Sequence, residues 1–262
     1  MKKIKITDIT PESMEKMKFI KKLLYIDEVD STNSYLLRNR STYKSGTAVI
    51  TLSQTSGRGR GNHIWDSNGC VAISVLIKNA AARLLPLAAA VAAACAVQHI
   101  LGLKTQIKWP NDILIEEKKI CGILCEAKLC SQDSITSSNI EAVCGAGFNL
   151  YQSQDYFEAV KLPHASSIYA QTGKILNYTD LALQFLLNLE QNIKLINVNA
   201  YTLLDEYKKK CITVGRQVKI MPGGDIAEAV DIAEDGALIV MTKSGREKIY
   251  GEVSVRGVNG YV

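Results

Sequence analysis

Runs of apolar residues mark the first elements of the chain. Two largely β-branched runs predict strands around 47–52 and 70–78, with a glycine-rich loop between them. The most apolar run, 84–101, is rich in alanine and contains Gln98 and His99. Its length and these two polar residues predict a buried helix and no membrane span.

Turn residues separate the elements in the rest of the first two hundred residues. Several side chains that can cap a helix, Asp30-Ser31-Thr32-Asn33, follow a basic, mixed opening segment and predict the start of a short helix. Over 104–130 the pattern predicts a strand, a corner, a second strand, a turn and a third strand. A polar loop is predicted at 131–139, followed by a strand at 140–150 that glycines interrupt. Two helices are predicted after that, one from a Thr179 cap to about Leu195 and a charged one ending at Lys210.

The pattern changes from about Ile212 onward. Short strands at close spacing are predicted at 214–221, 227–232, 236–242 and 248–255, separated by glycine-containing turns. So short an all-β unit buries little surface alone and needs a neighbour to pack against. We therefore expect an α+β chain with two domains, a catalytic domain at 1–210 and a small β-barrel at 211–262.

Composition narrows the class of protein. The net charge of +5 favours anionic ligands in general without requiring nucleic acid. Neither a signal peptide nor a membrane span is recognisable, and the seven cysteines are odd in number, so we expect reduced thiols and a cytoplasmic protein. Cys121 and Cys125 lie four apart in a strand-like run without a second pair, which indicates packing and argues against zinc.

A glycine–arginine loop at 57–65 is the first candidate site. Glycines at 57, 59 and 61 allow the backbone to approach a ligand closely, and Arg58 and Arg60 bring two guanidinium groups into one small region. Guanidinium pairs well with carboxylate and phosphate. The loop therefore indicates an anion site, although an RNA-binding or merely solvated loop would have similar composition.

A second candidate segment covers 108–126. Trp109 and Pro110 form a corner that is followed by two polar residues, Asn111 and Asp112. Lys118 and Lys119 then come just before an apolar strand. Each of these residues also fits an ordinary turn. The segment therefore indicates a functional site only in combination with the arginine loop.

In this order and spacing, the two segments resemble the active-site segments of biotin protein ligases. The resemblance extends from Asp30-Ser-Thr-Asn33 to Gly251-Glu-Val-Ser-Val-Arg256. It implies a catalytic domain similar to class II aminoacyl-tRNA synthetases, followed by a barrel similar to an SH3 domain. It also implies that biotin is activated with ATP to biotinyl-5'-AMP and then transferred to a lysine of a biotin carboxyl carrier protein.

The resemblance assigns roles to individual positions of this chain. Arg58 and Lys119 would be catalytic, with Arg58 holding the biotin carboxylate and Lys119 reaching the reacting oxygens. Biotin would contact Ser31, Thr32, Asn33, Gln54, Arg58, Gly59, Arg60 and Lys119. ATP would contact Arg60, Trp65, Asn111 and Asn149, and Mg²⁺ would accompany ATP, with Asp112 helping to orient it directly or through water.

Two departures from the family pattern are visible. Many members carry further arginines where this chain has Asn62 and His63, and the sequence leaves open whether His63 replaces a phosphate contact. The residues before Ser31 are too few for the DNA-binding winged helix of some bacterial relatives, so DNA binding is not expected. No membrane partner is expected either, because no membrane span is recognisable.

Three alternatives and the oligomeric state stay open. A lipoate or octanoate ligase of the same fold, a non-catalytic biotin-binding module and a DNA-binding regulator would each share part of the pattern. The sequence also leaves open whether the chain forms a homodimer.

Overall fold

The computed structural model describes residues 6–9, 12–61, 63–79, 82–129, 140–258 and 260–262. Its larger sheet has the strand order β1-β2-β3-β4-β8-β7-β6-β5. Only β2 and β3 are parallel, and the other neighbours are antiparallel. The strands are β1 Ile6–Ile9, β2 Lys22–Ile26, β3 Thr47–Thr51, β4 Cys70–Lys78, β5 Gln106–Lys108, β6 Asp112–Ile115, β7 Lys118–Leu129 and β8 Ile140–Asn149.

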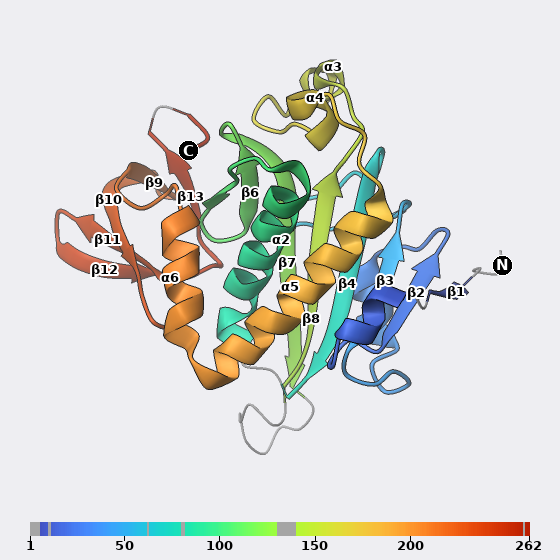
Figure 1. The fold of residues 1–262 in the computed structure, drawn as a ribbon. Helices are drawn as coiled ribbons and strands as arrows, with labels where there is room; N and C mark the ends of the chain where they lie inside the picture. The colour runs from blue at the N-terminus through green and yellow to red at the C-terminus, as the bar shows by residue number, and fades with distance from the viewer. Residues whose placement is uncertain (1–5, 10–11, 62, 80–81, 130–139, 259) are drawn as a thin grey trace.

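Helices cover the two faces of this sheet unequally. Two short 3-10 turns accompany them, at Glu12–Lys16 and Ala82–Leu84. The helices are α1 Thr32–Arg38, α2 Leu85–Leu101, α3 Gln154–Ala159, α4 Ile168–Thr172, α5 Tyr178–Val198 and α6 Ala200–Lys210. Figure 1 shows the long helices α2 and α5 crossing one face of the sheet. On the opposite face α1 packs through Leu36 onto alternate strand residues that include Val49 and Leu76.

The alanine-rich helix α2 is a core helix. By length and composition it is apolar enough to cross a membrane, but most of it is buried inside the protein. Its small side chains let α5 approach closely, and α5 donates two side-chain hydrogen bonds to its backbone carbonyls. Asn192 Nδ2 lies 2.9 Å from Ala88 O and Asn188 Nδ2 lies 3.2 Å from Ala92 O.

A second, five-stranded antiparallel sheet follows α6. Its order is β12-β11-β10-β9-β13. Its strands are β9 Gln217–Met221, β10 Asp225–Ile232, β11 Leu238–Thr242, β12 Gly245–Ile249 and β13 Ser254–Gly257. It docks beside the β5–β6 end of the larger sheet (Figure 1), where Trp109 Nε1 donates to Gly236 O over 3.1 Å. The Trp109 backbone N–H also donates to Thr213 Oγ1 over 2.9 Å, so this tryptophan links the two sheets.

The structure confirms the predicted strands around 47–52 and 70–78 and the buried helix at 84–101. The strand predicted at 140–150 is continuous, because its glycines make room for neighbouring side chains without breaking the ladder. The fourth strand predicted in the C-terminal unit is wrong in extent, since Tyr250–Val253 form a turn that separates β12 from β13.

Other boundaries near the chain ends and loops also differ from the prediction. The opening segment contains β1 and β2, for which no strand was predicted. Asn177, and not Thr179, caps α5, because its side chain accepts from the Thr179 N–H over 2.8 Å. The predicted polar loop at 131–139 lies outside the described residues.

We expect Phe148→Ala to lower the free energy of unfolding by about 3–5 kcal/mol, the usual cost of deleting a fully buried ring. Phe148 is completely buried on β8 and packs edge-on against Phe185 of α5, with ring centroids 5.8 Å apart. Urea unfolding measures the change. The exposed Ile175→Ala is the control, with a change within about 0.5 kcal/mol. A loss below about 1 kcal/mol for Phe148→Ala would contradict this packing.

Candidate functional site

The face of the larger sheet that carries α1 also carries most of the predicted site residues. Strand alternation sends Ala72 and Ser74 of β4, Gly145 and Gly147 of β8, and Gly122 of β7 to this face. The glycines leave space that other side chains fill. A Cβ at Gly145 would lie 2.3 Å from Asn33 Oδ1, and one at Gly147 would lie 2.6 Å from the Trp65 ring.

A buried network of neutral polar groups surrounds the N-terminus of α1. Ser31 caps the helix, because its side chain accepts from the Ser34 N–H. Gln54 Oε1 accepts from both the backbone N–H and the hydroxyl of Thr32, over 2.9 and 3.1 Å. Ser74 Oγ lies 2.7 Å from Thr32 Oγ1 and 2.7 Å from Asn33 Oδ1. Such a connected set of donors and acceptors is suited to a ligand with its own polar ring atoms.

Ser74 was not among the predicted site residues. It is fully buried, and it is the polar member of the otherwise apolar run from Val71 to Ile77. That polar position inside an apolar strand is the signal that could have found it, because a buried hydroxyl needs a partner.

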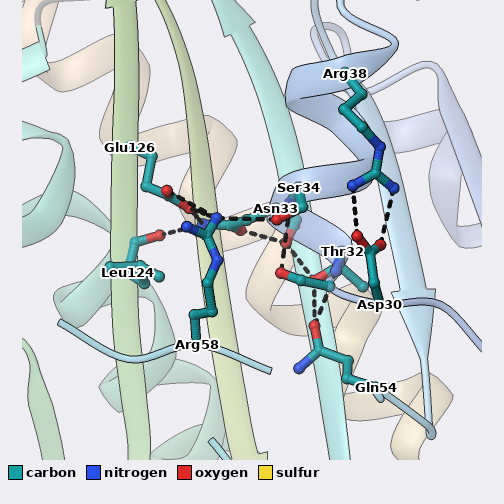
Figure 2. Close-up of polar contacts among 11 residues, drawn as sticks. Asp30, Thr32, Asn33, Ser34, Arg38, Gln54, Arg58, Leu124 and Glu126 are labelled. Carbon is teal, nitrogen blue, oxygen red and sulfur yellow. Dashed lines mark hydrogen bonds and ion pairs between the residues drawn. The ribbon is translucent and has the colours of Figure 1, made fainter. Parts of the chain in front are cut away.

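Arg58 lies next to this network and pairs with a carboxylate. Its Nη2 donates to both oxygens of Glu126 on β7, each over 2.9 Å, and to Ser34 Oγ over 3.0 Å. Asn33 Nδ2 donates to Glu126 Oε2 over 2.9 Å and to Leu124 O over 3.1 Å. Figure 2 shows the Arg58 guanidinium between Glu126 and the start of α1. Glu126 is a second site residue that the sequence analysis did not identify.

Arg60 points to a different part of the molecule. Its Nη1 donates to Asn111 Oδ1 over 2.9 Å, and its Nη2 donates to Val253 O of the C-terminal unit over 3.0 Å. Burial lowers the pKa of Arg60, and nearby Asp112 opposes that shift. The guanidinium therefore remains a fixed positive charge in a largely dry position.

A buried ion pair joins two of the predicted residues. Lys119 Nζ lies 2.5 Å from Asp112 Oδ1, and the Tyr261 hydroxyl donates to Asp112 Oδ2. Burial of Asp112 opposes its ionisation, but Lys119 and Lys108 outweigh this effect and hold its pKa below the usual value. The carboxylate is thus ionised and oriented by several partners.

Tyr261 is held between two further groups. Its ring stacks on His164, with centroids 5.1 Å apart, and Lys108 Nζ lies 3.9 Å from its ring centroid. Burial lowers the pKa of Lys108 to about 8, and Lys119, Arg256 and Arg60 add to the lowering while Asp112 opposes it. Neither Tyr261 nor Lys108 was a predicted site residue. Lys108 pairs with Asp112 across the short β5–β6 hairpin, whereas only the tertiary fold brings Tyr261 to Asp112.

The two arginines therefore point toward opposite ends of an elongated site, Arg58 toward Glu126 and Arg60 toward Asn111. Asn111, the partner of Arg60, hydrogen bonds with Ile123 of β7, which lies three positions before Glu126, the partner of Arg58. Strand residues rise by about 3.3 Å each, so the two attachment points are roughly 10 Å apart along β7. The Lys119 amine lies near the Arg60 end, because it reaches along the strand to Gly122, whose added Cβ would lie 3.2 Å from it.

The Trp65 indole covers the glycines in the middle of the site. It lies over Gly122 and Gly147, with Lys119 Nζ 5.7 Å from the ring centroid. Its Nε1 is buried against Gly147 and near the Cys70 thiol, so the ring is held on the sheet.

Asn149 and His63 contribute less directly to this arrangement. The Asn149 amide is already used, donating to Ser166 O over 2.9 Å and accepting from Cys70 Sγ over 3.3 Å. His63 is exposed, and its carbonyl accepts from the Gly59 N–H over 2.8 Å, which helps to fold the loop. Asn62 lies outside the described residues.

The side chains around Asp112 do not fit direct binding of a metal ion. Both oxygens of Asp112 already contact cationic or hydroxyl partners, and the described residues contain no group of three histidine, cysteine or acidic side chains suited to a metal. A hard cation such as Mg²⁺ prefers several oxygen ligands, which this position does not offer.

Two family profiles and several known proteins match the sequence of this chain. The profile of the Biotin/lipoate A/B protein ligase family matches residues 25–149, and that of the Biotin protein ligase C terminal domain matches 213–256. The Bifunctional ligase/repressor BirA of Bacillus subtilis is 30% identical over 239 residues, which cover 87% of this chain and 72% of that protein. The Biotin--[acetyl-CoA-carboxylase] ligase of Mycobacterium tuberculosis is 27% identical over 81% of this chain and 80% of that protein.

A solved structure has the same fold over most of its length. The biotin protein ligase from Aquifex aeolicus in complex with biotin and ATP superposes with a TM-score of 0.76 and 28% identity. The match covers 90% of this chain and 98% of that one, so it includes both sheets.

The lowered pKa of Lys108 predicts a pH-dependent stability. The folded pKa of about 8 lies below the ordinary value of 10.5, so between these values the unfolded chain binds more protons and stability rises with pH. We expect the stability difference between the parent and Lys108→Met to shift in favour of the parent from about pH 7 to pH 10. Urea unfolding measures it, with the exposed Lys104→Met as control. A difference that is constant with pH would show that Lys108 keeps its charge when folded.

Proposed function

The chain belongs to the biotin protein ligase family, and we propose that it activates biotin with ATP and transfers it to a lysine of a biotin carboxyl carrier protein. The observation that supports this most directly is the elongated site itself. It has a neutral polar network at one end and a cluster of cations around one buried carboxylate at the other. A molecule with a polar ring, an apolar chain and a carboxylate matches that order.

The cationic end is suited to adenylation. In this step a carboxylate oxygen of biotin attacks the α-phosphorus of ATP, the bond to the bridging oxygen breaks, and pyrophosphate leaves. Both reactants are anions, so preorganised positive charge lowers the barrier by offsetting their repulsion and the charge that develops. Lys119 and Arg60 are the residues that we assign to this role, because both are held in place by neighbouring side chains.

The polar network is suited to the ring of biotin. Thr32, Asn33 and Gln54 offer oriented donors and acceptors, and Ser31 fixes the start of the helix that carries two of them. Gly59 would let the loop backbone approach the ligand. The prediction that Arg58 holds the biotin carboxylate would require its guanidinium to leave Glu126.

The nucleotide is proposed to bind beside Trp65, near Arg60 and Asn111. The position of the Trp65 ring over Gly122 and Gly147, with Lys119 Nζ 5.7 Å from its centroid, supports this assignment. A contact from Asn149 would require it to exchange its present partners. We expect Mg²⁺ to arrive with the triphosphate, which with water supplies the oxygen ligands that Asp112 does not provide.

Transfer completes the reaction. The amine of the carrier lysine attacks the carbonyl of biotinyl-5'-AMP, an amide bond forms, and AMP leaves. The C-terminal sheet, which we propose to be an SH3-like barrel, contributes Val253 and Tyr261 to the reacting end and is therefore placed to meet the carrier. The larger sheet with its helices is proposed to correspond to the class II synthetase-like catalytic domain, and the enzyme to act in the cytoplasm.

Exchange of labelled pyrophosphate into ATP tests the proposed function. We expect exchange that depends on biotin and is much weaker with lipoate or octanoate, because the polar network would be left unpaired by a head group without ring N–H donors. Exchange that prefers lipoate would support the alternative ligase. Biotin binding without exchange would support a non-catalytic binding module.

We expect Lys119→Ala to slow biotin-dependent exchange on the order of 10²-fold or more, the scale for losing a preorganised charge at a reacting centre. Lys118→Ala is the matched control and should be near neutral, because Lys118 Nζ instead donates to Pro163 O over 2.6 Å. Equal losses in the two variants would refute the assignment of Lys119.

A further inference from the structure

We propose that Glu126 is a positioning residue that fastens the glycine–arginine loop, residues 57–65, over the biotin end of the site. By holding Arg58 it sets how long biotin and biotinyl-5'-AMP stay bound. This inference rests on the proposed function, and it gives Arg58 a partner on the protein in place of the biotin carboxylate.

The contact between Arg58 and Glu126 is short and is made by a single guanidinium nitrogen. One guanidinium nitrogen of Arg58 lies 2.9 Å from each oxygen of Glu126, and the same nitrogen lies 3.0 Å from Ser34 Oγ. The side chains are 46% and 25% exposed, so the pair lies at the surface of the site and is not part of the buried core. An ion pair at such a position can open and close without unfolding the protein.

The loop is attached to the rest of the protein by its two arginines and by the Trp65 ring, which lies over Gly122 and Gly147. Its own hydrogen bonds, such as Trp65 N to Gly57 O over 3.0 Å, keep it folded but do not attach it to the sheet. Arg60 attaches one side of it to Asn111 and Val253, and Arg58 attaches the other side to β7. Loss of the Arg58 contact would therefore free the loop at the biotin end while the reacting end stays fastened.

Glu126 also joins the loop to the polar network. Its Oε2 accepts from Asn33 Nδ2 over 2.9 Å, and Asn33 Oδ1 lies 2.7 Å from Ser74 Oγ. Figure 2 shows this chain of contacts running from Glu126 through Asn33 toward Thr32 and Gln54. One carboxylate therefore contacts both Arg58 of the loop and Asn33 of the polar network.

The two roles of Arg58 predict opposite effects of the same substitution. If Arg58 binds the biotin carboxylate, Glu126 competes with biotin for it, and Glu126→Gln should tighten binding. If Glu126 fastens the loop, Glu126→Gln should loosen binding, because the amide keeps the shape of the side chain but loses its charge.

The experiment measures dissociation of biotin and of biotinyl-5'-AMP from the parent and from Glu126→Gln, together with KM and kcat for pyrophosphate exchange. We expect both dissociation rates and KM for biotin to rise by about three- to tenfold, the scale for a partly exposed ion pair with additional hydrogen bonds. The effect on kcat should be smaller than that on KM, because the reacting end keeps its own attachments.

Three further variants separate a loop fastening from a general structural effect. Glu126→Asp should recover part of the retention, and the exchanged pair Arg58→Glu with Glu126→Arg should retain the intermediate better than either single variant. Glu141→Gln is the matched control, since Glu141 lies on the neighbouring strand and pairs with Arg40 and Lys78 away from the loop. It should dissociate both ligands at the parental rate.

The outcomes distinguish this inference from the proposed function. A parent enzyme without biotin-dependent exchange would defeat the proposed function. An active parent with unchanged or slower dissociation in Glu126→Gln would overturn only the role of Glu126. If that variant does not fold, Arg58→Gln removes the same contact from the loop side, and parental retention in it would equally overturn the inference.

Discussion

The arrangement of the reacting end depends on one buried carboxylate, that of Asp112. A buried charge is costly unless cations and hydrogen bonds compensate it, and Asp112 is compensated by Lys119, Lys108 and the Tyr261 hydroxyl. These partners come from β5, from β7 and from the segment after β13. Asp112 therefore aligns Lys119 and also fastens the C-terminal unit against the larger sheet.

The charges around Asp112 do not cancel. Lys119, Lys108, Arg60 and Arg256 all influence this region, while Asp112 and the more distant Glu252 supply negative charge. Burial is the main cause of the lowered pKa of Lys108, and the neighbouring cations add to it, so the region favours an anion. A phosphate or carboxylate that enters would relieve cation–cation repulsion, which favours binding of the reactants without rearrangement of the protein.

The sequence allowed the main strands, the alanine-rich helix and most of the proposed site to be predicted, because these follow from local pattern and from the spacing of the two loop segments. It did not reveal Glu126 or Tyr261, whose neighbours Arg58 and Asp112 are distant in the chain. The glycines of β8 were also predicted, wrongly, to interrupt the strand. Their reason is visible only when Asn33 and Trp65 are seen to occupy the space that side chains would fill. Residues that act through tertiary contacts are thus the ones that pattern alone misses.

Because the two arginines point to different parts of the site, they can serve two different tasks, catalysis and retention of the ligand. Positive charge that lowers the barrier is useful only where the carboxylate and the phosphate meet, which we propose to be at Lys119 and Arg60. A contact at the other end acts equally on substrate, transition state and intermediate, so it changes how tightly all of them are held and not how fast they interconvert. We propose this second task for Arg58 and Glu126, which pair with each other away from Lys119. A two-step enzyme needs it, because the reactive adenylate must remain enclosed until the acceptor amine arrives.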